Sequence, residues 1–191
     1  LDGFEADDVI GTLAKKAEKA GYDVYMVTPD KDYGQLVSQH IKIYKPPYQG
    51  SIFEILGPKE VCTKWDIENV NQVIDILGLM GDAVDNIPGI AGVGEKTAAK
   101  LLKEYGSIEN VLQNADNIKG ALGEKVRKGK EDAILSKKLA TIITDVPVTF
   151  EETDFLVKEL DKNILNEIFT ELEFKTLGKR LLGEEVPAPT A

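Results

Sequence analysis

Polar and apolar residues alternate along the first third of the chain in patterns typical of an α/β fold. Apolar residues recur every three or four positions from Asp7 to Ala20, which predicts an amphipathic helix that ends at Gly21. The β-rich run Asp23–Thr28 predicts a strand, and Asp30–Asp32 a turn after it. A short helix is expected at Gln35–Gln39.

Two more β-rich runs flank the turn-like sequence PPYQG, and from Pro58 onward the pattern becomes helical. The two runs, Ile41–Lys45 and Ser51–Ile55, predict a hairpin. The helices expected after it are Lys59–Lys64, Val70–Met80, Glu95–Tyr105, a segment capped by Ser107, two short helices within Lys119–Lys138, and Asn163–Leu172. A last strand is expected at Val146–Phe150 and a frayed tail at Val186–Ala191.

Net charge and composition limit the kinds of site and partner that we expect for this chain. The 191 residues carry a net charge of −10, which argues against a nucleic-acid partner unless the acids gather where metal ions bind. His40 is the only histidine and lies in a polar stretch, so imidazole-assisted nucleophilic catalysis is not expected. Cys62 is the only cysteine, which excludes a disulfide within the chain. We expect no membrane span, and because the chain begins with Leu1, a fragment or processed product.

Carboxylates gather in three short segments at the boundaries of predicted elements. Each segment alone has an ordinary interpretation, because acids cap helix starts and aspartates form turns. Together they suggest a metal site: converging carboxylates need protons or cations to relieve their repulsion, and Mg²⁺ prefers oxygen ligands. Two such ions can catalyse phosphoryl transfer without histidine or cysteine. The seven candidate ligands are Glu5, Asp7, Asp8, Asp30, Asp32, Asp82 and Asp85.

A glycine-rich connector, Asn86–Gly94, leads into the helix predicted at Glu95–Tyr105. Its glycines allow a tight turn, and the free N–H groups of the helix start can hold a phosphate. Around that helix, Lys96, Lys100 and Lys103 lie within about 60° of one another. This basic stripe has two interpretations: a contact surface for one DNA backbone, or an ordinary solvated helix face. A nucleotide-binding P-loop is excluded, because Glu95 interrupts the required motif and no strand precedes it.

Three motifs resemble those of the 5′-nuclease domain of bacterial DNA polymerase I. They are GFEADDVIGTLA, TPDKDYGQLV and GLMGDAVDNIPGIAGVGEKTAAKLL, in the family's order and spacing, and the resemblance extends from Asp2 to about Leu182. It implies an incomplete three-layer nuclease core of the PIN or resolvase type, followed by a helical subdomain with a helix–three-turn–helix element. The expected divisions are 1–68 for the core, 69–145 for the DNA-binding subdomain, and 146–191 for the domain end and a linker toward the polymerase.

The same resemblance implies roles for individual residues. All seven candidate carboxylates match family metal ligands for two or more Mg²⁺ or Mn²⁺ ions, with Asp30, Asp32 and Asp82 as the catalytic residues. The helix–three-turn–helix element matches Asn86–Leu102 and implies contacts to duplex phosphates. In the family it also holds a monovalent cation, typically K⁺, which would lie near Ile90 and Val93. The implied DNA-binding residues are Gly89, Gly92, Gly94, Lys96, Thr97 and Lys100.

The activity implied by the resemblance is a 5′–3′ exonuclease and flap endonuclease that acts in replication and repair as part of DNA polymerase I. The expected protein is a cytoplasmic, nucleoid-associated bacterial monomer that binds DNA with 5′ flaps, nicks or ends. The family also has an earlier strand, further metal-binding aspartates and a helical arch, and the resemblance implies that this chain starts after them. We therefore expect weak metal binding and poor or no cleavage. Two alternatives stay open: a non-catalytic duplex-DNA-binding fragment, and an exonuclease without a polymerase.

Overall fold

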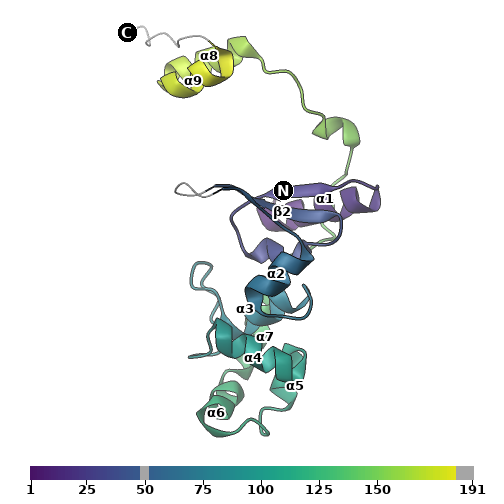
Figure 1. Ribbon diagram of the computed structural model, residues 1–191, viewed down its shortest axis with the longest axis vertical. Coiled ribbons are helices and arrows are strands. Elements are labelled where there is room, and N and C mark those ends of the chain that lie inside the picture. Colours follow the sequence, from purple (N-terminus) through teal and green to yellow (C-terminus); the bar gives the residue numbers. More distant parts are fainter. Residues whose placement is uncertain (48–51, 184–191) are drawn as a thin grey trace. The chain divides into compact units, whose positions relative to one another are not determined.

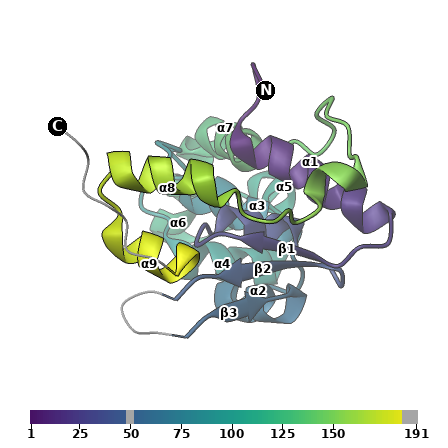
Figure 2. The same cartoon turned by 90° about the horizontal axis from the view of Figure 1, so that it is seen from above.

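The computed structural model describes residues 1–47 and 52–183, in two compact units, Leu1–Phe150 and Glu151–Ala191. The first unit begins with a small α/β layer, in which three strands lie in the order β1-β2-β3 (Figure 2). Strands β1 and β2 are parallel, whereas β2 and β3 are antiparallel. The elements are α1 (Ala6–Lys19), β1 (Val24–Val27), the 3₁₀ helix η1 (Asp32–Leu36), β2 (Ile41–Lys45), β3 (Glu54–Leu56) and α2 (Pro58–Trp65).

Helix α3 (Gln72–Met80) forms the centre of the helical part of the first unit (Figure 1). Its residues Val73, Ile76, Leu77 and Leu79 are fully buried, because α3 is apolar on nearly every side and packs against several helices. The helices that follow it are α4 (Glu95–Tyr105), α5 (Ile108–Gln113), α6 (Gly120–Lys128) and α7 (Lys130–Ala140).

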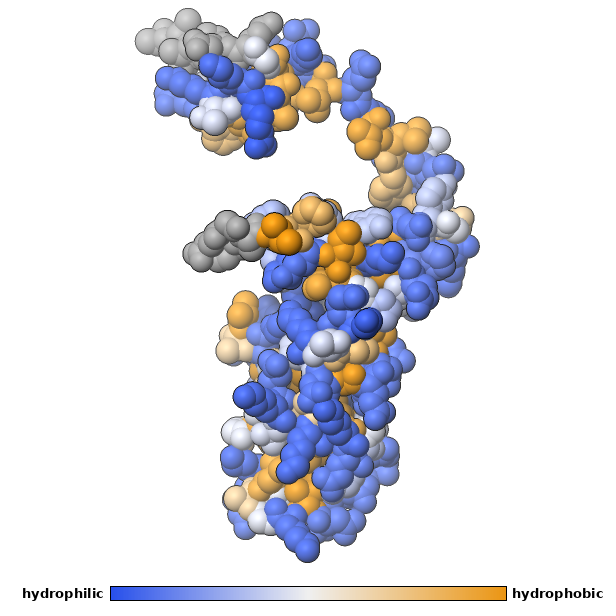
Figure 3. Space-filling view, viewed as in Figure 1, coloured by the Kyte–Doolittle hydropathy of each residue, from blue (hydrophilic) through white to orange (hydrophobic). Residues whose placement is uncertain are grey.

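The two faces of the sheet differ in the described residues. Met26, Ile41 and Ile43 point to one face and are buried in the core, against which α1 and η1 pack. The other face is exposed: Val27 is 69% exposed, and Tyr44 stacks on Phe53 with 5.2 Å between ring centroids. Figure 3 shows hydrophobic surface over this hairpin. Among the described residues of the first unit, helices therefore cover only one face of the sheet.

Most of the predicted elements are confirmed, and the hairpin and the paired helices α6 and α7 occur where expected. The strand predicted at Val146–Phe150 is wrong: the segment has no regular structure. It crosses α1 instead of joining the sheet, because Thr12 Oγ1 accepts from Val146 N at 3.1 Å and Lys16 donates to the Val148 carbonyl. Side chains of α1 thus bind the Val146 amide and the Val148 carbonyl, and Val148 N donates to the Val146 carbonyl within the segment.

Two further elements differ clearly from their predicted boundaries. The helix expected at Gln35–Gln39 is a 3₁₀ helix that begins earlier, at Asp32, and Val37 is already extended because Ser38 turns the chain into β2. The last strand of the hairpin begins at Glu54, and Ser51 lies outside the described residues.

The second unit contains η2 (Glu152–Phe155), α8 (Lys162–Glu171) and α9 (Lys175–Leu182). Asp161 caps α8 by accepting from the amides of Asn163 and Ile164 at 3.1 Å. Helix α9 was not predicted. Glu173, in a left-handed conformation (φ 55°), joins the two helices, and the ring centroids of Phe169 and Phe174 lie 6.3 Å apart. The predicted tail Val186–Ala191 lies outside the described residues. The divisions expected at residues 68 and 145 stay predictions.

A strap, residues 140–146, connects α7 back to the α/β layer. Gln35 Nε2 donates to the Ala140 carbonyl and Gln35 Oε1 accepts from Ile142 N, both at 2.9 Å. Farther along the strap, Asp8 Oδ1 accepts from Ile143 N at 2.8 Å. The strap thus holds the helical part to the segments that carry two of the three acidic clusters.

Replacing Gln35 by alanine is expected to lower the free energy of unfolding by about 2 kcal/mol, because it leaves a buried carbonyl and a buried amide without partners. Urea denaturation measures the loss. Gln113→Ala, at the exposed end of α5, is the matched control and is expected to change stability by less than about 0.5 kcal/mol. Equal stability of both variants would contradict the role of Gln35.

Candidate metal centre

The turn after β1 brings the second acidic cluster to the end of a strand. Thr28 Oγ1 accepts from Asp30 N at 3.1 Å, and Asp30 Oδ1 accepts from Asp32 N at 3.0 Å. These side-chain turns fix the backbone so that Asp32 enters η1 and is only 8% exposed. Asp30 therefore orients Asp32, with one of its own oxygens bound to the backbone.

The third cluster lies on a short loop that leaves α3. The loop closes because Asp82 and Ile87 exchange two backbone hydrogen bonds, at 2.9 and 2.7 Å. Asp82 Oδ1 accepts from Val84 N at 2.9 Å, which orients its carboxylate. Asp82 is buried and Asp85 is exposed.

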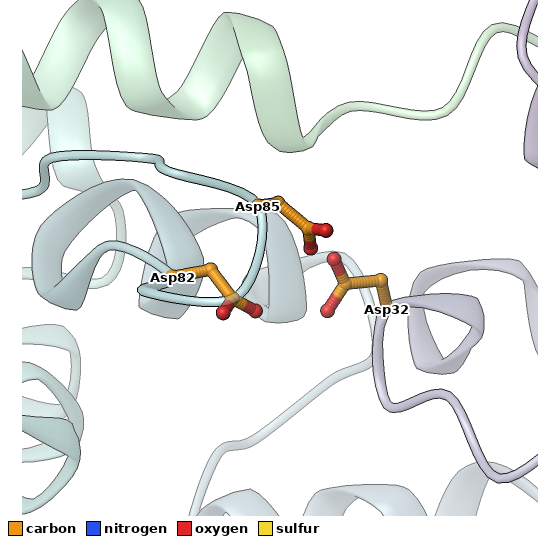
Figure 4. Close-up of side chains that lie close together, drawn as sticks. All are labelled: Asp32, Asp82 and Asp85. Atoms are coloured by element: carbon orange, nitrogen blue, oxygen red, sulfur yellow. The ribbon is translucent and has the colours of Figure 1, made fainter.

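The two loops meet at the carboxylates of Asp32, Asp82 and Asp85. One oxygen from each lies within 4.8 Å of the other two (Figure 4). Lys31 forms an ion pair with Asp82, and its Nζ lies 3.7 Å from Asp32 Oδ1. Residues from two acidic clusters, 50 positions apart in sequence, thus form one centre with a lysine at its edge.

The centre has opposite effects on its two buried carboxyls. Burial raises the pKa of Asp32 to about 6, Lys31 opposes the rise, and the nearby acids Asp30, Asp82 and Asp85 add to it. Burial acts in the same direction on Asp82, but the hydrogen bonds from Lys31 and Val84 N outweigh it, so the pKa of Asp82 falls below its usual value. The negative charge of Asp32 is therefore the less compensated one.

The first acidic cluster lines the same groove as the second. The groove has a volume of about 1210 Å³ and is open to solvent; Glu5, Asp7, Asp8, Asp30, Asp32 and Asp85 are among its lining residues. Within the cluster the carboxylates differ. Asp8 accepts from Glu5 N and Ile143 N, whereas Asp7 accepts from the Tyr33 hydroxyl at 2.9 Å. Asp8 is thus used mainly in capping α1 and holding the strap.

The donor set fits a divalent cation. Asp32 Oδ1 is buried and accepts no hydrogen bond, although such oxygens are nearly always satisfied. A carboxylate oxygen of Asp32 also lies within 4.8 Å of oxygens of Asp82 and Asp85, and hard cations such as Mg²⁺ and Mn²⁺ take carboxylate oxygens with water as the remaining ligands. An ion at this centre would relieve the uncompensated charge.

The glycine-rich connector has the close contacts that its sequence suggests. Gly89 has φ 58°, and a Cβ there would lie 2.2 Å from Gly81 N. Gly92 has φ 75°, while Gly94 is at φ −104° with open space around it. Ser136 of α7 accepts from Gly89 N at 2.8 Å. The tight turn therefore depends on Gly89 and Gly92, and Gly94 serves as the N-cap of α4.

The lysines of α4 divide into two groups. Lys96 and Lys100 are exposed and have no ion pair in the described part of the chain, and Thr97 is half-buried beside them. Lys103 Nζ donates a hydrogen bond to Asp66 Oδ1 at 2.5 Å. Two of the three lysines on the predicted stripe are thus available to a polyanion.

Sequence reasoning missed Lys31 and Gln35 as parts of this region. Lys31 stands between the two aspartates of the second cluster, and a cation between two acids was an available signal. Gln35 offered no such signal, because its partners in the strap are backbone groups 105 and 107 positions away.

Two family models match consecutive parts of the chain. The model described as the N-terminal resolvase-like domain of 5′-3′ exonuclease matches residues 1–66, and the one described as its C-terminal SAM fold matches residues 68–163. They correspond to the α/β layer with α2 and to the helical part with the start of the second unit. No helix among the described residues is long and apolar enough to cross a membrane.

Curated relatives include the DNA polymerase I of Caldicellulosiruptor bescii, 42% identical over 188 residues, and the 5′-3′ exonuclease of Aquifex aeolicus, 41% identical over 181 residues. The alignments cover 97% and 95% of this chain, but 22% of the first relative and 60% of the second. The chain therefore spans only part of either relative.

Solved structures with this fold include a 5′-exonuclease of T5 with bound zinc, with a TM-score of 0.66 and 20% identity over 75% of this chain and 52% of that one. The catalytic core of Rad2 in complex with a DNA substrate gives a TM-score of 0.58 and 18% identity over 95% of this chain and 58% of that one. At these identities the comparison establishes a shared fold.

Proposed function

Because the chain belongs to the 5′–3′ exonuclease family, we propose that it carries a metal-dependent nuclease site that hydrolyses phosphodiester bonds near the 5′ ends of DNA strands. The observation that carries this proposal is the meeting of Asp32, Asp82 and Asp85, together with a buried oxygen of Asp32 that accepts no hydrogen bond. No histidine or cysteine lines the groove, which suits hydrolysis by metal-activated water.

In this proposal Asp30, Asp32 and Asp82 are the catalytic residues, and Glu5, Asp7, Asp8 and Asp85 complete the ligand set. A bound divalent cation would supply an activated water and neutralise charge on the phosphoryl oxygens. The side chains contribute orientation: Asp30 fixes the Asp32 amide, Val84 N fixes Asp82, and Tyr33 fixes Asp7. Asp8 is oriented by the amides of Glu5 and Ile143, each of which donates to one of its oxygens.

The proposed DNA grip is the glycine connector with the start of α4, where Gly89, Gly92, Gly94, Lys96, Thr97 and Lys100 contact the duplex backbone without reading sequence. A monovalent cation, K⁺ in this proposal, binds near Ile90 and Val93. One carbonyl of this turn, that of Gly92, already accepts from a cation, Lys125 Nζ, at 3.0 Å, which supports the proposal.

Replacing both Lys96 and Lys100 by alanine is expected to weaken binding to duplex DNA about tenfold and to lower the slope of log affinity against log salt by about 2, because each phosphate contact releases counterions. Fluorescence anisotropy at several salt concentrations measures both quantities. Lys103→Ala, on the same helix but paired with Asp66, is the control and should change neither. An equal loss in the control would contradict a two-lysine contact.

The wider setting is also a proposal: a role in replication and repair, action on flaps, nicks and ends, polymerase domains in cis, and a cytoplasmic monomer close to the nucleoid. The polymerase relatives support polymerase domains in cis, whereas the Aquifex relative carries the name of an exonuclease alone. The second candidate function is duplex binding without cleavage. Lys31 favours it, since its ammonium already neutralises Asp82.

A further inference from the structure

The residues of α7 and the strap that line the groove are mainly apolar, with Lys137 and Lys138 among them. Ile134 and Leu139 are 54% and 56% exposed, and with Ile143 of the strap they line the groove that the carboxylates also line. In Figure 4 the green helix α7 passes above the three aspartates. We call Ile134, Leu139 and Ile143 the apolar wall. The groove thus has an acidic side and a hydrophobic side.

The apolar wall has no role in the core of the described unit. Helix α7 packs against α3 through other residues, of which Ala133, Ser136 and Ala140 are buried. A single exposed leucine is ordinary, but three large apolar side chains along one groove expose surface that water solvates poorly. Such a surface at a binding groove is typical of contact with a ligand.

We propose that the apolar wall contacts the sugar and base of an unpaired nucleotide whose neighbouring phosphate is held at the Asp32–Asp82–Asp85 centre. The proposal rests on the nuclease function proposed above. A nucleotide matches the groove because it has an anionic group for the metal-loaded acidic side and an apolar ring face for the other. Exposed Lys138, between Ile134 and Leu139, suits the next phosphate along the strand.

The two sides of the groove argue against other apolar occupants. A lipid chain or a hydrophobic peptide would bury the carboxylates of the acidic side without pairing them, which is costly. A base within a duplex has its faces stacked on its neighbours, so it presents only its edges to a protein. The apolar wall therefore favours an unpaired or frayed nucleotide over a paired one.

The test is binding of the 191-residue chain to a duplex with a one-nucleotide 5′ flap, with Ca²⁺ in place of Mg²⁺, by fluorescence anisotropy. The variant is Ile134→Ser with Leu139→Ser, both on exposed positions. The matched control is Leu135→Ser, 48% exposed on the same helix but not lining the groove. We expect the double variant to bind the flapped duplex about tenfold more weakly, and the control to bind like the unmodified chain.

A second DNA substrate, whose flap nucleotide lacks its base, turns the comparison into a double-mutant cycle between protein and DNA. Removing the base should weaken binding of the unmodified chain about tenfold and leave the double variant unaffected, because both changes remove the same contact. Two results would show that the apolar wall makes no base contact. One is that the double variant binds the normal flap as tightly as the unmodified chain. The other is that removal of the base weakens binding of the double variant as much as it weakens binding of the unmodified chain. If no variant binds DNA in a metal-dependent way, both the nuclease function and the wall contact are wrong.

Discussion

Replacing Asp32 by asparagine is expected to stabilise the metal-free protein and to abolish its stabilisation by divalent cations. The folded-state pKa of Asp32 is raised from 3.8 to about 6, so its ionised form opposes folding. The loss of folding stability caused by ionised Asp32 is absent at low pH, grows as the pH rises from about 4 to about 6, and is complete above that range. It corresponds to about 3 kcal/mol, which asparagine removes.

Urea denaturation in a chelating buffer at pH 8, and again toward pH 4, measures this difference, which should shrink as the pH falls. Added Mn²⁺ should then raise the stability of the unmodified chain but not that of Asp32→Asn. Asp116→Asn, whose side chain is 92% exposed, is the control and should behave like the unmodified chain. A destabilised, metal-responsive Asp32→Asn would show that Asp32 is not the uncompensated charge of the centre.

Replacing Gly89 by alanine is expected to lower the free energy of unfolding by about 4 kcal/mol or more. At φ 58° the added Cβ would lie 2.2 Å from Gly81 N and 2.4 Å from Met80 C, both backbone atoms that cannot rotate away. The two chain segments that would be forced apart are those that position Asp82 and the start of the DNA-binding turn, so DNA and metal binding should be lost with stability.

Gly94→Ala provides a control within the same motif. Gly94 is at φ −104° with no heavy atom within 4 Å of an added Cβ, so only the N-cap preference of α4 is affected, at a cost of about 1 kcal/mol or less. Circular dichroism during thermal unfolding ranks the two variants. If Gly89→Ala were no less stable than Gly94→Ala, the close approach of Gly81 and Gly89 would be absent in solution.

The sequence predicts the elements with strong local patterns well. Helix α4 occurs at the predicted residues Glu95–Tyr105, and Ser107 caps α5 by accepting from Asn110 N. Elements that depend on distant partners were predicted less well. The failure at Val146–Phe150 is of this kind, because a β-rich run becomes a strand only where a sheet edge is free to pair with it. Here α1 supplies the partners instead.

In the candidate site, too, features with a local sequence pattern are predicted and features that depend on distant contacts are not. The acidic residues were visible as clusters at element ends, and the structure brings Asp32, Asp82 and Asp85 together. The individual roles were not visible in the sequence. Asp8 stays a predicted metal ligand like Asp7, and the structure adds a second role, because its two oxygens also accept from the amides of residues 5 and 143. The apolar wall was also missed, since its residues look like ordinary helix positions until the groove is formed.

The most direct test of the proposed metal centre is the binding of Mn²⁺ to the 191-residue chain, counted by electron paramagnetic resonance. We compare the unmodified chain with Asp32→Asn, Asp82→Asn and the exposed control Asp116→Asn. We expect the unmodified chain and the control to bind Mn²⁺ alike, and the two centre variants to bind it at least about tenfold more weakly, because each loses a ligand charge. Equal binding by all four proteins, or none by the unmodified chain, would contradict a metal centre at Asp32, Asp82 and Asp85.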